Sequence, residues 1–511
     1  MPRNETLKGG ALVLAAIAAC YSANAQNYAP PVGTTPATPS AGLVNDYLRK
    51  QSDAFKPWDF GGQFRVRYEL KNNFATPGNP PAIVGGDPGA LDFRDKGGNP
   101  HNDYILLREK VHVGYAQPWF GAYVEGRDSS SHGDDRDPNP EADEFDLYQG
   151  FITIGNPKEF PLSLKVGRQE LIYGDERLIG PSDWLNIPRT FDAVKLRYEG
   201  TQGWIDAFTS RPVLADDHSF NMANEYETFS GIYASTKTLI PKQESQAYFL
   251  ARNVEEKSPF AHVKDVPQAG GASPRDIYTV GLRVKSLPNQ FGGFDYGAEL
   301  AGQFGRYQDA GTSLTVQRTK KSLSHEAFAA YVGMGYTWTN VSFTPRVGFE
   351  YNFASGDSDP TDKDHETFDN LYPTNHKRYG IADFVSLQNI HNVKFMSSVA
   401  PCKNFTVSLE YNLYWLAETA DSFYTVTGAR RGSATPPAAP TGKGYGINKS
   451  YDSFVGSELD LVATYKIKPW AIAQVGYAHF FTGKYVDQSL SAPGFGSKDA
   501  DYVYLQTTFN F

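Results

Sequence analysis

Apolar and polar side chains alternate with a period of two along most of this chain. The alternation is clearest from Val341 to Phe353, where most odd-numbered positions are Val, Phe or Tyr and the even-numbered positions are polar or glycine. The same pattern runs from Phe60 to Leu70 and from Phe405 to Trp415. Because a β-strand points successive side chains to opposite faces, each segment predicts a strand with one apolar and one polar face.

Further segments of this kind are separated by turn signals. Together they predict about eighteen antiparallel strands, and a barrel of that size encloses an aqueous channel. Besides the three segments above, the predicted strands are residues 103–115, 119–128, 145–154, 162–171, 190–199, 203–211, 229–239, 246–254, 276–285, 295–306, 327–338, 388–399, 457–466, 470–481 and 501–511. The predicted fold is therefore an all-β transmembrane barrel. A soluble sandwich also alternates, but it does not explain several charges on each polar face.

Connections alternate between short and long. Gln117-Pro118 and Lys468-Pro469 predict tight periplasmic turns. The predicted extracellular loops are residues 129–143, 211–228, 255–275, 354–386 and 417–450.

Composition supports a barrel over a helical membrane protein. Mean hydropathy is -0.46 and aromatic residues make up 14% of the chain. We find no run of about 18 apolar residues after the N-terminus, which a membrane-spanning helix would need. A barrel hides its membrane signal because lipid-facing and lumen-facing residues alternate.

The C-terminal segment predicts the closing strand. Val503, Leu505, Phe509 and Phe511 share one face, and polar side chains occupy most of the other. A final strand that ends in Phe resembles the signal read by the outer-membrane assembly machinery. The alternative is an ordinary edge strand of a secreted β-protein. The predicted location is the outer membrane of a Gram-negative-type cell.

The N-terminus predicts export. Arg3 and Lys8 precede an apolar stretch, and Ala23-Asn24-Ala25 forms a cleavage site, so residues 1–25 are a predicted signal peptide. The alternative is a lipidated Cys20. Residues 26–56 are predicted to be a disordered lead-in with a short helix near 43–50, and residues 57–511 to be the barrel.

The alternation of side chains along each predicted strand also predicts which charged residues face the lumen, because they lie at the same odd or even positions as the other polar residues. The basic ones outnumber the acidic ones, which predicts a mildly cationic lumen that concentrates anions. The alternative is that these charges pair with each other. The basic set is Arg65, Arg67, Arg108, Lys110, Arg127, Lys165, Lys195, Arg197, Arg283, Lys285 and Arg346, and the acidic set is Glu69, Glu125, Glu299, Glu350, Glu410, Glu458 and Asp460.

Four aspartates cluster in one predicted loop. Asp357, Asp359, Asp362 and Asp364 offer closely spaced oxygens, which Ca²⁺ prefers. The segment lacks the glycine and distal glutamate of an EF-hand loop, so a solvated acidic loop is the alternative. No other cofactor and no nucleic-acid partner is predicted.

Three stretches resemble the alginate export family of outer-membrane barrels. They are residues 164–198, which contain Gly167-Arg-Gln-Glu-Leu171, residues 367–380, and residues 456–465 with 475–483. The resemblance implies an eighteen-stranded barrel with an arginine-rich constriction that passes an anionic polysaccharide, together with periplasmic export partners. Carried over by motif, the constriction residues are Arg168, Arg177 and Arg189, with Asp175, Glu176 and Asp192 as their partners. Arg168 shares the parity of apolar Leu164 and Val166, so it faces the lumen only if the strand bulges there.

Two alternative functions remain open at this point. Substrate-specific porins for small carboxylates carry a similar Gly-Arg-Gln-Glu-Leu strand. A barrel enzyme is the other, but the ten histidines are scattered and no compact Ser/His/Asp or metal-binding spacing is present. The sequence therefore favours a non-enzymatic channel for an anionic solute.

Overall fold

A computed structural model describes residues 42–74, 92–96, 101–136, 139–255, 274–308, 322–431 and 444–511. The predicted signal peptide, Cys20 and nearly all of the lead-in before residue 42 lie outside these residues. The predicted helix is confirmed as α2 (Leu43–Gln51), which precedes the first strand. None of the described helices is long and apolar enough to cross a membrane.

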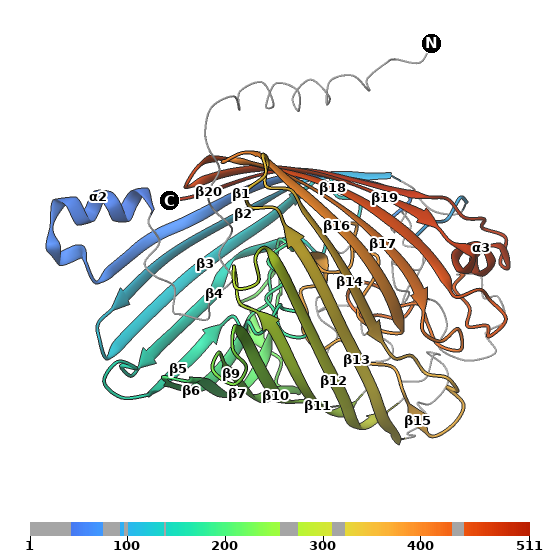
Figure 1. Ribbon diagram of the computed structural model, residues 1–511, viewed down its shortest axis with the longest axis horizontal. Coiled ribbons are helices and arrows are strands. Elements are labelled where there is room, and N and C mark those ends of the chain that lie inside the picture. Colours follow the sequence, from blue (N-terminus) through green and yellow to red (C-terminus); the bar gives the residue numbers. More distant parts are fainter. Residues whose placement is uncertain are drawn as a thin grey trace, which may run out of the picture.

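The chain forms a closed barrel of eighteen antiparallel strands (Figure 1). Its strands are β1 (Trp58–Asn72), β2 (His101–Ala116), β3 (Phe120–His132), β4 (Asp143–Ile154), β5 (Leu162–Gln169), β6 (Phe191–Gly200), β7 (Gly203–Leu214), β9 (Glu227–Thr236), β10 (Gln243–Val254), β11 (Arg275–Ser286), β12 (Phe294–Gln308), β13 (Ser322–Thr337), β14 (Arg346–Ala354), β16 (Ile390–Cys402), β17 (Phe405–Leu416), β18 (Phe454–Lys468), β19 (Ala471–Thr482) and β20 (Ala500–Asn510). Two short ladder segments, β8 (Met222–Ala223) and β15 (Asp364–His365), and one helix, α3 (Lys484–Ser491), lie in the connections.

The first and last strands close the barrel. β20 pairs with β1 along its length, with Leu505 opposite Tyr68, and the backbone N–H of Gly62 donates to the carbonyl of Phe511 at 3.0 Å. Closure leaves no open sheet edge, which lipid would not tolerate. The prediction that the C-terminal segment is the closing strand is confirmed.

The two faces of the wall differ as the sequence predicts. On β20, Leu505 points outward and is 55% exposed, whereas Tyr502 and Tyr504 are buried on the inside. Every charged residue that parity assigned to the lumen falls on the inner face, as the strand registers show. The alternation therefore identified the water-facing side of each strand.

Three predicted strands are shorter than expected. β5 ends at Gln169 and not at residue 171, β9 ends at Thr236 and not at residue 239, and β14 differs most. The segment predicted from Val341 enters β14 only at Arg346, so the prediction is wrong for residues 341–345. Phe343 and Thr344 have φ of +67° and +40°, which a strand does not allow, and they form the turn after β13. The alternation continued through a turn because a turn can also place apolar side chains at every second position.

The long connections fill much of the barrel interior. The β5–β6 loop (residues 170–190), the β14–β16 loop (355–389) and the β17–β18 loop (417–453) contribute many buried side chains. Phe384 of the β14–β16 loop packs on Phe74 and Phe93 with ring centroids 4.4 and 4.5 Å apart. The apolar core of this barrel therefore lies inside the lumen, between loops and wall.

Candidate functional site: a luminal constriction

The tip of the β5–β6 loop is held by cations on the inner faces of β1 and β2. Arg65 Nη1 and Arg108 Nη1 donate to the carbonyl oxygen of Asp183 at 2.8 and 2.9 Å. Arg67 Nη1 donates to the carbonyl oxygen of Trp184 at 2.7 Å. Carbonyls at a loop tip have no strand partner, and the planar guanidinium fork supplies the missing donors.

This basic wall (Arg65, Arg67, Arg108 and Lys110) is covered by the loop that it holds. Its three arginines are at most 3% exposed, and Lys110 Nζ lies 3.2 Å from the Asp183 carboxylate. The sequence predicted these residues as pore-lining and substrate-binding. The structure instead uses them as anchors for the constriction, because most of their donors bind the β5–β6 loop or neighbouring side chains.

Arg177 is a second anchor. It extends from the β5–β6 loop to the opposite wall, where Nη1 donates to Asn352 Oδ1 at 2.7 Å and Nη2 to Glu350 Oε2 at 3.2 Å. Its guanidinium lies 3.4 Å from the ring centroid of Tyr331. Arg177 is buried, so it ties the loop to β14 and β13 and is not exposed to solute.

Asp175 takes its partners from β11. Arg283 Nη2 and Lys285 Nζ lie 2.7 and 2.9 Å from its carboxylate. Burial alone would raise the pKa of Asp175, but Arg283, Arg378 and Lys285 hold it well below its usual range. The ion pairs of Asp175 are therefore with β11 and not with an arginine of its own motif.

Glu176 pairs with the β14–β16 loop. Its carboxylate accepts from Lys377 Nζ at 2.6 Å and from Thr374 Oγ1 at 2.7 Å. Its predicted partner was also an arginine of its own motif, but the ion pair is with Lys377. Lys377, 201 positions away in the sequence, supplies the positive charge because the two loops meet inside the lumen.

Arg168 and Asp192 pair as predicted, but on the outer face. The Arg168 Nε and Asp192 Oδ1 atoms are 2.8 Å apart. The register places both on the same face as Val166 and Val194, and Val194 is exposed on the outside. Arg168 is not part of the pore, because β5 has no bulge that would turn it inward.

The two inward loops pair with each other through their backbones. Tyr372 N donates to Leu178 O at 2.9 Å and Gly180 N donates to Tyr372 O at 2.8 Å. Arg189 Nη1 donates to the carbonyls of Gly180 and Pro373 at 3.0 and 3.2 Å, so it spans both loops. The constriction is thus one unit built from the β5–β6 and β14–β16 loops.

An aromatic stack joins the two loop tips. The rings of Trp184 and His376 are 3.9 Å apart and nearly parallel, at 6°. Arg67 lies 3.9 Å from the Trp184 ring centroid, and His376 Nδ1 is 2.9 Å from an Asp383 oxygen. Sequence reasoning did not select Trp184 or His376, although both lie in the stretches that carry the family resemblance.

Two lysines near the constriction keep much of their side chains exposed. Lys377, on the β14–β16 loop, is 47% exposed, and Lys285, on the inner face of β11, is 43% exposed. Each contacts a carboxylate of the β5–β6 loop. They present positive charge to water, which the buried arginines do not.

The inner face of β17 and β18, separated from β1 by β19 and β20, is acidic. This acidic wall (Glu410, Glu458 and Asp460) contacts one cation in the described chain, Lys394, 3.4 Å from Glu410 and shared with Glu350 at 3.5 Å. Ala382 N donates to Glu458 Oε1 at 2.9 Å and Asn412 Nδ2 to Asp460 Oδ2 at 3.3 Å. The acidic wall therefore also holds the β14–β16 loop.

The two remaining predicted arginines form ion pairs on the inner wall. Arg197 Nε lies 2.6 Å from Asp206 Oδ1, and Arg346 Nη2 donates to Asp295 Oδ1 at 2.8 Å. Arg197 also lies 4.5 Å from the Trp204 ring. Both arginines face the lumen as predicted.

The aspartates predicted to bind calcium turn toward their own backbone. Asp357 Oδ1 accepts from Asp359 N at 3.1 Å, and Asp362 Oδ1 accepts from Asp364 N at 2.7 Å. Burial, followed by the nearby Asp421, raises the pKa of Asp357 to about 7. In the described chain no three His, Cys, Asp or Glu side chains are grouped to hold a metal ion. The calcium site therefore stays a prediction from the sequence.

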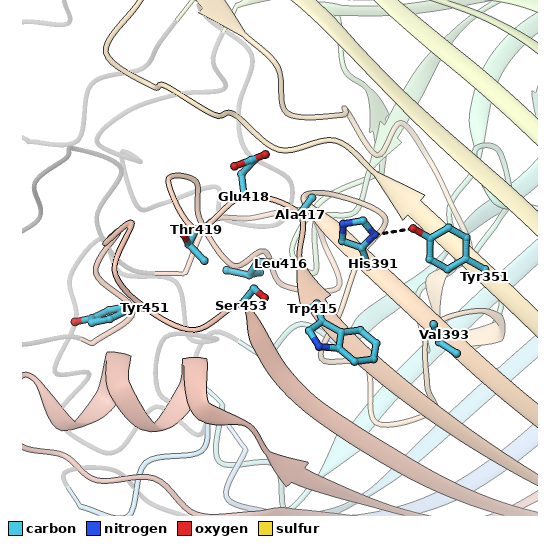
Figure 2. A pocket seen from close by; sticks show the side chains of 10 residues that line it. All are labelled: Tyr351, His391, Val393, Trp415, Leu416, Ala417, Glu418, Thr419, Tyr451 and Ser453. Atoms are coloured by element: carbon cyan, nitrogen blue, oxygen red, sulfur yellow. Dashed lines mark hydrogen bonds between the residues drawn. The ribbon is translucent and has the colours of Figure 1, made fainter.

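A separate cavity of about 590 Å³ lies on the outer wall (Figure 2). Tyr351, His391 and Trp415 line it on the outward face of β14, β16 and β17, and the Tyr351 hydroxyl lies 2.7 Å from His391 Nδ1. Leu416 at the end of β17 and residues 417–419 of the β17–β18 loop also line it. It faces away from the lumen and takes no part in the constriction.

Comparisons with known proteins agree with this architecture. The chain is similar to Pseudomonas aeruginosa OccD3 (OpdP), with a TM-score of 0.53 and 12% identity over 89% of this chain and 91% of that one. It is also similar to OpdQ of the same organism, with a TM-score of 0.52 and 12% identity over 90% and 99% of the two chains. OpdK of that organism gives a TM-score of 0.52 and 10% identity over 89% and 98%.

These likenesses concern the fold, which is that of outer-membrane channels. A search among curated protein sequences found no match. The model of a family described as alginate export matches residues 90–492, most of the barrel and both paired loops. A match over this much of the chain shows that the protein belongs to the alginate export family.

Proposed function

We propose that the protein is a non-enzymatic outer-membrane channel that passes an anionic polysaccharide of the alginate-like polyuronate class. The observation that carries the proposal is the exposed positive charge of Lys377 and Lys285 at a constriction whose anchoring arginines (Arg65, Arg67, Arg108 and Arg177) are buried. Cations inside a narrow, low-dielectric passage raise the local concentration of anions. A polyuronate carries one carboxylate per sugar and would meet these ammonium groups in succession.

Two partly buried arginines, Arg189 and Arg378, add to this field. Arg189 donates to carbonyl oxygens of both loops, and Arg378 Nη2 donates to the carbonyl of Asp175 at 2.7 Å. A carbonyl carries no net charge, so these contacts fix the guanidinium groups without cancelling them. They support a positive potential at the paired loops.

The location and the partners belong to the same proposal. The exposed apolar outer face supports contact with outer-membrane lipid. A terminal Phe on the closing strand supports recognition by the outer-membrane assembly machinery, and residues 1–25 are proposed as the export signal. Periplasmic export partners are proposed from family membership.

A small carboxylate is the second candidate cargo. The Trp184–His376 stack brings the two loop tips into contact, which suits a short solute better than a wide polymer. OpdK, which shares the fold, was solved with vanillate. For this chain, a porin for small carboxylates stays an alternative to polymer export.

Charge reversal at the exposed lysines tests the channel proposal. Lys377→Glu combined with Lys285→Glu should shift the reversal potential across a salt gradient from anion toward cation preference. One charge at about 4 Å and an effective dielectric of about 20 is worth roughly 4 kcal/mol before screening. Salt at about 0.15 M screens beyond about 8 Å, so only charges at the narrowest part should matter this much.

Lys449→Glu is the matched control, because it makes the same charge change on an exposed loop. An unchanged reversal potential in the double variant would remove the physical basis of anion transport. Current block by uronate monomers and by oligomers then separates the two cargoes. Stronger block by oligomers supports the polysaccharide, and equal block supports the small carboxylate.

A further inference from the structure

A buried pair of histidines joins the β14–β16 loop to the barrel wall. His325 lies on the inner face of β13, and His365 lies in β15, which pairs with β13 in parallel. Their Nδ1 atoms are 2.9 Å apart, and the side chains are 0% and 6% exposed. The His365 ring stacks on Tyr307 at 3.8 Å. The pair therefore sits where the loop leaves the strands and begins to fill the lumen.

Neighbouring hydrogen bonds fix the protons of this pair. Gln303 Oε1 accepts from Asp369 N at 2.7 Å, so the nearby His325 Nε2, at 3.3 Å, faces an acceptor. His325 then carries its proton on Nε2, and its Nδ1 is an acceptor. His365 must donate from Nδ1. The observed contact therefore requires a His325 that is not protonated on Nδ1.

The surroundings oppose additional positive charge. Arg275 of β11 and Arg252 of β10 both bind Asp369, at 2.7 and 2.9 Å, so that carboxylate is already paired. Burial, His325, Arg430 of the β17–β18 loop and Arg275 hold the pKa of His365 well below its usual value. Tyr307 of β12 supplies only a ring face.

We propose that His325 and His365 form a proton-operated latch for the β14–β16 loop. The neutral pair holds the loop against β13. Protonation of His325 on Nδ1 turns both facing nitrogens into donors, breaks the contact and releases the root of the loop. Passage through the lumen then changes, because the same loop forms half of the constriction. The latch is a property beyond the proposed cargo and holds for either cargo.

The direction of the pH effect follows from the two states. In a released loop, water reaches the imidazoles, and their pKa returns to about 6.5. The latched state excludes the added proton, so it is favoured above about pH 6.5 and loses free energy as the pH falls below that value. Each histidine can change the ratio of released to latched loop by up to about tenfold per pH unit. Arg252 and Arg275 hold the pKa of Asp369 well below its usual range, so this ion pair survives in that window.

Single-channel recording of the full chain in planar bilayers tests the latch. The open fraction of the wild-type channel should rise severalfold between about pH 7.5 and about pH 5. His325→Gln with His365→Gln keeps polar side chains but removes titration, so the response should disappear. An identical response in the wild type and in this double variant would overturn the proposal.

The control is His376→Gln, since His376 also lies in the constriction beside Asp383. This variant should keep the pH response. If it loses the response instead, the constriction histidine is the sensor and the latch is refuted. A heat-dependent shift in gel mobility shows which variants contain a folded barrel.

A cross-link gives an independent measurement. His325 and His365 are opposite each other in the β13–β15 ladder, so cysteines at both positions, in a Cys402→Ser background, should form a disulfide. The oxidised channel should keep a low open fraction at both pH values, and reduction should raise it at both. If the oxidised channel opens at low pH as the wild type does, release of this loop root is not the gating step.

Discussion

The basic wall and the acidic wall of the lumen hold loops with opposite chemistry. The basic wall (Arg65, Arg67, Arg108 and Lys110) binds carbonyl oxygens and a carboxylate at the tip of the β5–β6 loop. The acidic wall (Glu410, Glu458 and Asp460) accepts the backbone N–H of Ala382 in the β14–β16 loop. Guanidinium and ammonium groups only donate, and carboxylates only accept. The charge of each wall therefore determines whether it can bind acceptor or donor atoms of a loop.

The two walls also differ in how their charges are compensated. Each arginine of the basic wall makes at least two hydrogen bonds to the protein. On the acidic wall, Glu458 and Asp460 are two buried carboxylates beside each other. Buried atoms without a partner among the described residues occur on both walls, namely Glu458 Oε2 and Asp460 Oδ1 and the Nε atoms of Arg65 and Arg108. Loss of one charge should therefore have opposite effects on the two walls.

The largest effect is expected on the basic wall. Arg67→Leu leaves the buried Glu69 without the guanidinium that lies 2.6 Å away, and it also frees the Trp184 carbonyl. Removing one partner of a buried ion pair costs about 3–5 kcal/mol. Urea unfolding in lipid vesicles, followed by tryptophan fluorescence, measures the loss. The control is Arg346→Leu, whose ion pair is partly exposed and should cost about 1 kcal/mol or less. Equal losses at the two positions would contradict the anchoring role.

A smaller effect of opposite sign is expected on the acidic wall. Glu458→Gln removes one of two adjacent buried carboxylates, and its side-chain oxygen can still accept from Ala382 N. Relief of like-charge repulsion should raise the free energy of unfolding by about 1 kcal/mol. The same urea titration measures this gain in stability. Glu410→Gln is the comparison, because Glu410 lies 3.4 Å from a cation, Lys394. A loss of several kcal/mol at Glu458 would show that its charge is required.

The smallest effect is expected in the acidic turn at residues 357–364, whose aspartates accept hydrogen bonds from within the same turn. Asp359→Asn should change the free energy of unfolding by about 0.5 kcal/mol or less, because the side chain is exposed and an amide oxygen can still accept from Thr361. Millimolar calcium should leave the unfolding midpoint of the wild type unchanged. A rise that disappears in Asp359→Asn would restore the calcium site that the sequence predicted.

The strands and their faces could be predicted because they depend on local order. A pleated strand alternates its side chains whatever it pairs with, so parity alone placed residues such as Arg65, Lys285 and Glu458 on the inner face. The same rule explains the objection to Arg168, which shares the outward parity of Val166. The family motif suggested a pore residue at this position, but the alternation of side chains along β5 places Arg168 on the outer face.

The role of each charge could not be predicted in this way. Arg177 and Glu350 are 173 positions apart, and Glu176 and Lys377 are 201 apart. No local period relates such residues, so a motif read by itself assigned the acids to the nearest arginines. Lys377 and the Trp184–His376 stack escaped selection for the same reason.

The sequence by itself determined that this chain forms a closed barrel of about eighteen strands, and which face of each strand meets water. Only the tertiary structure decided where the loops go. Closing the barrel brings loops from distant strands into one confined lumen, where each buried polar group must find a partner among whatever lies nearby. The wall arginines therefore became anchors for the β5–β6 loop, and two exposed lysines were left to face the water.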